Sequence, residues 1–201
     1  MILSMKSGNV VEFIDRQKII CPIVLEVKKQ RLRLLTENDR EVNLSARRLL
    51  HKCEMRLDLS MGRHKVVDAL KEIVNRRKEL TNHIDLKGLW EVLNTEQEWI
   101  GLGTMTEFCF PDNPTNDNES AVVRAFFNNR LYFRFDHDRF FPNSEEQVER
   151  KAAQEKEAAL RNQIIEEGGI WLKSVLNDST PSLPDDKLEI AKILKSFYIF
   201  E

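Results

Sequence analysis

The alternation of short apolar segments with polar turns over residues 8–50 most constrains what this chain can fold into. Segments 10–14 and 31–36 place β-branched residues or regularly spaced leucines as a partly buried strand needs them. The polar turns recur every few residues, which is typical of antiparallel hairpins. Four or five strands in fewer than 55 residues predict a small SH3-like β-barrel over residues 1–55. The predicted strands span 10–14, 19–27, 31–36 and 41–45.

Helical spacing replaces this alternation from residue 60 onward. Apolar residues recur at three- and four-residue intervals over 60–82 and predict a connecting helix within residues 56–84, with Ser60 as its N-cap. The basic run 76–78 is expected on the far, solvent side of this helix. Asp85 is placed to cap the next helix.

Residues 85–143 carry a third pattern, of helices followed by a hairpin. Apolar stripes predict a helix around 86–93, a second that starts near Thr95 or Thr104, and a third over 119–129. Aromatic runs flank the polar segment 136–138 and predict a β-hairpin. Three helices and a hairpin in under 60 residues are typical of a winged helix-turn-helix.

The last segment, 144–201, is predicted to be a C-terminal helical region with a linker. Ser144 begins a capping-box pattern, and a helix rich in Lys, Glu and Ala is expected to run to about residue 165. The glycine pair 168–169 is expected to interrupt it, and another helix is expected over 188–200. The whole chain is therefore predicted to belong to the α+β class.

Charge is divided unevenly along the chain, although the formal total is only −2. Residues 1–80 hold 18 Lys and Arg against 11 Asp and Glu, whereas the remainder holds 13 against 22. The basic part could face phosphates, and two solvated surfaces of opposite sign are the alternative. The candidate nucleic-acid-binding residues of the barrel are Lys28, Lys29, Arg31, Arg33, Arg47 and Arg48. Possible nucleic-acid contacts of the winged helix are Arg124, Asn128 and Arg134.

The sequence offers little for catalysis. Its seven glycines are scattered, and neither a zinc-ligand spacing nor a nucleophile motif is present. Acidic pairs such as Asp185–Asp186 could hold Mg²⁺ only with partners that the sequence does not identify. We therefore expect no catalytic residue, metal ligand or cofactor in this chain.

Cysteine usage and hydropathy bear on location. Three widely spaced cysteines argue against a disulfide framework and for a reducing cytoplasm. No apolar run approaches the roughly 20 residues of a membrane span, so we expect no membrane partner.

Six segments together form a recognisable pattern: GNVVEF (8–13), REVNLS (40–45), LWEVL (89–93), AVVRAFF (121–127), RLYFR (130–134) and RFFPNSEEQVE (139–149). This pattern resembles the N-terminal region of bacterial ribonuclease II-type (RNB-domain) exoribonucleases. The resemblance covers roughly residues 8–175. In that family a small β domain and a winged helix precede the nuclease domain, which hydrolyses RNA from the 3′ end with Mg²⁺ held by clustered aspartates. That aspartate motif has no counterpart here.

The resemblance thus implies an accessory region that binds and guides single-stranded RNA and that is not catalytic by itself. Its implied partners are RNA and the RNB catalytic domain, which is missing from this chain and which would hold the Mg²⁺. A winged-helix module that binds DNA, or that dimerises through the helix over 144–165, is the alternative of a different class. Light scattering and a duplex-DNA titration separate the two.

Overall fold

The computed structural model describes residues 5–177, apart from positions 30, 97, 113 and 137, together with residues 190 and 192. The chain divides into two compact units, Met1–Ser144 and Glu145–Glu201. The first contains strands and helices, so the predicted α+β class is confirmed. No helix in the described part of the chain is long and apolar enough to cross a bilayer.

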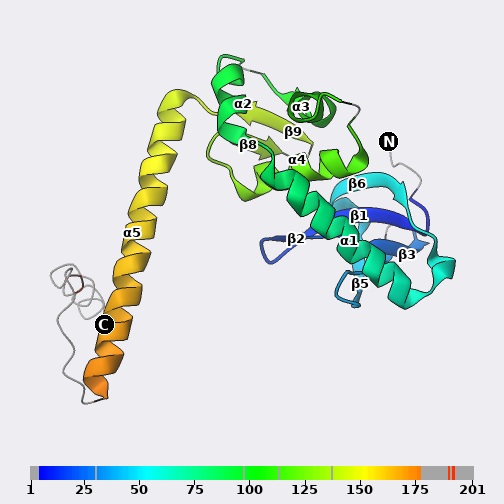
Figure 1. Cartoon of the computed structure of the whole chain (residues 1–201), viewed down its shortest axis with the longest axis horizontal. Coiled ribbons are helices and arrows are strands. Elements are labelled where there is room, and N and C mark those ends of the chain that lie inside the picture. Colours follow the sequence, from blue (N-terminus) through cyan, green and yellow to red (C-terminus); the bar gives the residue numbers. More distant parts are fainter. Residues whose placement is uncertain are drawn as a thin grey trace. The chain divides into compact units, whose positions relative to one another are not determined.

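Six strands of the first unit form a curled antiparallel sheet, a half-barrel (Figure 1). They are β1 (Asn9–Asp15), β2 (Lys18–Ile20), β3 (Ile23–Lys28), β4 (Arg31–Leu35), β5 (Glu41–Ser45) and β6 (Leu49–Arg56). The strand order is β2-β1-β3-β4-β5, and β6 also pairs with β1. The sequence did not predict β6, because its buried positions include His51 and Cys53 rather than typical strand formers.

Both faces of this sheet are covered, which explains why residues 10–13 of β1 are all buried. One face packs on helix α1 (Arg63–Asn82). The side chains of the other face pack against one another inside the curl of the sheet. The core against α1 comprises Val10, Cys21, Ile23, Leu35, Cys53, Val66, Val67, Leu70 and Ile73. The core inside the curl comprises Val11, Phe13, Val24, Leu32, Leu34, Leu44 and Leu49.

Helix α1 differs from the prediction at two points. Ser60 lies in a preceding 3₁₀ turn, η2 (Leu59–Met61), where it donates to Asp58, so its predicted role as the N-cap of α1 is wrong. The basic run does not lie wholly on the solvent side, because Arg77 is fully buried. Arg77 follows Ile73 by four residues, and helical geometry therefore turns it toward the core.

The remainder of the first unit is a helical module built on a small sheet. Its elements are α2 (Leu86–Leu93), β7 (Ile100–Gly101), α3 (Leu102–Cys109), α4 (Asn116–Asn128), β8 (Phe133–Asp136) and β9 (Arg139–Pro142). The hairpin β8–β9 is confirmed, and β7 adds a third strand in the order β7-β9-β8. Asp85 caps α2 as predicted, accepting from the backbone N–H groups of Lys87 and Gly88.

Two helix starts of this module were predicted wrongly. Helix α3 begins at Leu102 rather than at Thr95 or Thr104. Helix α4 begins at Asn116, three residues before the predicted start at 119, because Thr115 and Asn118 form a capping box there. The helices enclose an aromatic core in which the Phe126 ring lies 4.9 Å from that of Phe133 and 4.3 Å from that of Phe140.

In the second unit, α5 (Glu145–Leu176) runs without a break. The predicted interruption at Gly168–Gly169 is therefore wrong. The helix expected over 188–200 lies outside the described residues, except for Ile190 and Lys192, which are helical.

Candidate nucleic-acid interface

Most of the candidate RNA-binding cations gather at one end of strands β3, β4 and β5. Lys28 and Arg31 are register partners at the β3–β4 turn, and both are exposed on the outer face. Arg31 lies opposite Ser45, the last residue of β5. The next three residues form the 3₁₀ turn η1 (Ala46–Arg48), which presents exposed Arg47 and Arg48. The register thus brings the turn residues and η1 together, as a phosphate-binding surface requires.

Ion pairs divide these cations into two groups. Lys28 Nζ lies 3.1 Å from Oε2 of Glu26, and Arg33 Nη2 lies 2.7 Å from Oε2 of Glu41. Within the described part of the chain, no carboxylate pairs with the other four, which we call the basic end: Lys29, Arg31, Arg47 and Arg48. The basic end therefore holds the charges that are available to an anionic ligand.

A surface groove of about 310 Å³ joins the basic end to the helical module. One wall consists of Arg47, Arg48 and residues of the neighbouring strands, and the other is formed by Arg130 and the end of β8. The lining residues are Ile14, Arg47, Arg48, Leu49, Leu50, Arg130, Phe135 and Asp136. Three guanidinium groups beside apolar side chains suit a nucleotide, which has both a phosphate and a base.

The half-barrel and the helical module are linked by a buried ionic cluster around Glu12. Oε1 of Glu12 accepts from Nη1 of Arg77 at 3.0 Å and from Nε of Arg124 at 3.0 Å. Its Oε2 accepts from the hydroxyl of Ser120 at 2.8 Å. Arg77 also donates from Nε to Asp117 at 2.8 Å. The strand β1 is thereby tied to both α1 and α4.

The charges in this cluster hold one another ionised. Burial alone would raise the pKa of Glu12, but the positive charges of Arg124 and Arg77 outweigh burial and lower that pKa. Burial likewise opposes the imidazolium form of His51. Its contacts with Cys53 and Glu119, with the charge of Glu12 nearby, outweigh burial and raise the pKa of His51 to about 9.

The three candidate residues of the helical module have different surroundings. Arg124 forms an ion pair with Glu12, and only 12% of its side chain is exposed. Asn128 is exposed at the last residue of α4. Arg134 is exposed on β8, where its guanidinium carbon lies 4.3 Å from the centre of the Phe141 ring. Of these three side chains, Asn128 and Arg134 are therefore open to solvent, whereas Arg124 is largely buried in the cluster around Glu12.

Sequence reasoning did not place Trp99 beside Arg134. Trp99, Arg139 and Phe141 join Arg134 on one face of the small sheet. The alternation of arginine with aromatic residues over 130–141 indicates the hairpin part of this face, but no local signal points to Trp99.

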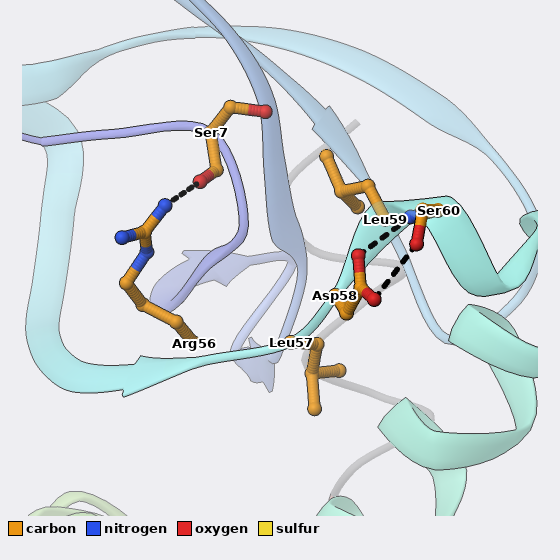
Figure 2. A pocket seen from close by; sticks show the side chains of 6 residues that line it. All are labelled: Ser7, Arg56, Leu57, Asp58, Leu59 and Ser60. Atoms are coloured by element: carbon orange, nitrogen blue, oxygen red, sulfur yellow. Dashed lines mark hydrogen bonds between the residues drawn. The ribbon is translucent and has the colours of Figure 1, made fainter.

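A second hollow, of about 430 Å³, lies beside η2 (Figure 2). Its polar groups are largely bonded to one another: Arg56 donates to the carbonyl of Ser7 at 2.9 Å, and the hydroxyl of Ser60 donates to Asp58 at 2.7 Å (Figure 2). This hollow presents one arginine, and its carboxylate is already bonded, so it is a weaker candidate than the groove beside the basic end.

The cysteines are free thiols, and burial raises the pKa of Cys21 to about 12. Among the residues that the structure describes, no three His, Cys, Asp or Glu side chains come close enough together to hold a metal ion.

Comparisons with known proteins give one informative likeness. No protein-family model and no curated protein matches the sequence. Among solved structures, the fold is similar to part of an active-site mutant of the Dss1 exoribonuclease from Candida glabrata, with a TM-score of 0.57 and 9% sequence identity. The match covers 88% of this chain but 28% of the Dss1 chain. The chain is therefore similar in fold to a minor part of the Dss1 chain.

Proposed function

We propose that this chain is an accessory region that binds single-stranded RNA and guides it to the catalytic domain of a 3′–5′ hydrolytic exoribonuclease of the ribonuclease II type. In this proposal the half-barrel is an SH3-like RNA-binding module and the helical module is a winged helix. The Mg²⁺ and the hydrolytic residues belong to the catalytic domain, and the protein acts in the cytoplasm.

The basic end is the observation that carries this proposal. Four exposed cations without a carboxylate partner in the described part of the chain gather on a fold that is similar to part of an exoribonuclease. Cations on a small β-barrel suit the phosphates of a single strand, since each contact releases condensed counterions. The groove beside Arg47 and Arg48 extends this surface toward the helical module.

A titration of labelled RNA tests the proposal. The full chain is added to a fluorescent oligoadenylate of about 20 nucleotides at low salt, and anisotropy reports binding. We expect Arg31→Glu with Arg47→Glu to weaken binding severalfold, because both charges are reversed at the basic end. The matched control is Lys65→Glu with Lys78→Glu, which makes the same change of charge at exposed positions of α1.

Four outcomes would contradict the proposal. Equal losses in the two double variants would show that net charge, rather than the basic end, attracts the RNA. Tighter binding to duplex DNA than to the single strand, or a stable dimer in light scattering, would favour the alternative winged-helix module. Shortening of the RNA by the chain in the presence of Mg²⁺ would show that the chain is itself catalytic.

A further inference from the structure

The outer face of the small sheet in the helical module carries an arginine–aromatic stack. Arg134 on β8 and Phe141 on β9 are register partners, and Arg139 lies on the same face of β9 because it precedes Phe141 by two residues. Trp99, just before β7, completes the set and is 42% exposed. We call these four side chains, Trp99, Arg134, Arg139 and Phe141, the arginine–aromatic face.

Cations and rings alternate across this face. The guanidinium carbon of Arg134 lies 4.3 Å from the Phe141 ring centre, and that of Arg139 lies 5.2 Å from the Trp99 ring. The Phe141 and Trp99 rings lie 5.5 Å apart and meet edge to face. The buried core on the opposite side of the sheet contains Phe133 and Phe140, whereas Phe141 is half-buried and Trp99 is exposed. Exposed rings and guanidinium planes are the groups on which unpaired bases stack.

Most of the positive charges of the helical module are concentrated at this place. The segment 85–142 has 5 basic and 10 acidic residues, yet Arg130, Arg134 and Arg139 lie on or beside the β8–β9 hairpin. The groove from the basic end reaches the same hairpin, because Asp136 lines the groove and also accepts from Arg139 at 3.1 Å. The groove that Arg47 and Arg48 line therefore ends at the residue that bonds to Arg139 of the arginine–aromatic face.

We propose that the arginine–aromatic face is a second RNA site, which stacks unpaired bases of a strand whose phosphates are held at the basic end. This inference rests on the proposed function and adds to it the part of the RNA that the face recognises. The basic end attracts any polyanion, whereas the face requires bases. The chain thereby distinguishes unpaired RNA from other polyanions.

The intrinsic fluorescence of Trp99 tests this site in the full chain. We expect the oligoadenylate to quench fluorescence in the unmodified protein and in Trp171→Phe, but not in Trp99→Phe. The background from Trp90 is constant, because that side chain is buried and its indole N–H donates to the carbonyl of Asn143. Inorganic polyphosphate, which has charge but no bases, is expected to bind without quenching.

A second variant separates stacking from charge. Arg134→Lys keeps the positive charge but loses the planar guanidinium. We expect it to bind oligoadenylate about fivefold or more weakly and to bind polyphosphate as the unmodified chain does. Equal affinity of Arg134→Lys for the oligoadenylate would overturn the inference, as would quenching that persists in Trp99→Phe.

The two proposals fail differently. RNA binding that depends on Arg31 and Arg47 but leaves Trp99 fluorescence unchanged would reject the arginine–aromatic face and leave the proposed function standing. Absence of RNA binding in the anisotropy titration would reject the proposed function, and the further inference with it.

Discussion

Arg77 donates a hydrogen bond from Nη1 to Oε1 of Glu12 at 3.0 Å, and neither side chain is exposed to solvent. The two residues lie on α1 and β1 and are 65 positions apart in the sequence. Removing one partner of such a pair leaves a buried charge without compensation, which is strongly destabilising. Glu12 would keep Arg124, but Asp117 would also lose a partner.

We therefore expect Arg77→Ala to lower the free energy of unfolding by about 3–5 kcal/mol. Chemical denaturation monitored by circular dichroism measures this change. Lys78→Ala, at the next, exposed position of the same helix, is the control and should change the free energy by no more than about 0.5 kcal/mol. Similar losses in the two variants would mean that the buried cluster does not stabilise the fold.

His51 makes stability depend on pH on the alkaline side. Its pKa is raised from 6.5 to about 9, so the folded protein binds this proton more tightly than the unfolded chain does. The resulting stability is fully present below pH 6.5 and is lost as the pH rises through 9. We expect the free energy of unfolding to fall by up to about 3 kcal/mol across this range. His51→Gln, which cannot ionise, should flatten that part of the profile in denaturation series at stepped pH.

The carboxylates of the same cluster make the stability of the fold depend on pH in the acid range. The pKa values of Glu12 and Glu119 are lowered, so their stabilising contributions are present above pH 4.5 and are lost as the pH falls through the folded values. We therefore expect the stability maximum between about pH 5 and 6.5. Glu119→Gln should weaken the acid-side loss and also reduce the alkaline-side loss, because Glu119 contacts His51. A profile unchanged by Glu119→Gln would contradict this coupling.

The two glycines in α5 give a matched pair of substitutions. A Cβ atom at Gly169 would meet nothing within 4 Å, whereas one at Gly168 would lie 3.3 Å from Cγ2 of Ile190. Alanine is favoured over glycine inside a helix by about 1 kcal/mol. Gly169→Ala should therefore raise the stability of α5 by about this amount, while Gly168→Ala should gain less. Hydrogen exchange of the α5 amides measures both, and an equal gain would show that Ile190 does not restrict position 168.

The salt dependence of the RNA-binding constant reports how many phosphate contacts the basic end makes. The logarithm of the binding constant falls with the logarithm of salt concentration, and each contact to a single strand contributes about 0.7 to the slope. Arg47→Ala with Arg48→Ala should lower the slope by about 1.4 if both residues bind phosphates. Anisotropy titrations at several salt concentrations give this slope. An unchanged slope with weaker binding would show that these arginines act other than through phosphates.

The sequence predicted elements wherever a local signal decides the structure. The leucines of 31–36 and the aromatic runs around 136–138 gave β4 and the β8–β9 hairpin, and Asp85 was identified as a helix cap. The sequence-based predictions were wrong where contacts between residues far apart in the sequence determine the structure. His51 and Cys53 form part of a buried strand because Arg77 and Glu119 provide partners that no local pattern reveals.

The same limit applies to the candidate site. The cations of residues 28–48 could be named from their spacing, and strand register then places Arg31 beside the residue that precedes η1. Which of them are neutralised depends on Glu26 and Glu41, whose positions follow from the register of neighbouring strands. Arg124 was proposed as a contact because it lies on a helix that commonly reads nucleic acid, but Glu12, 112 residues earlier, pairs with it.

The arginine partners of Glu12 lie far after it in the sequence, and this order affects how the protein folds during synthesis. The ribosome makes β1 first, because Arg77 follows Glu12 by 65 residues and Arg124 follows it by 112 residues. A nascent chain that contains only the six strands can place His51 beside Glu12, but it lacks both arginines that donate to this carboxylate. The buried cluster around Glu12 is therefore complete only when α1 and α4 have been made, although β1 is made first.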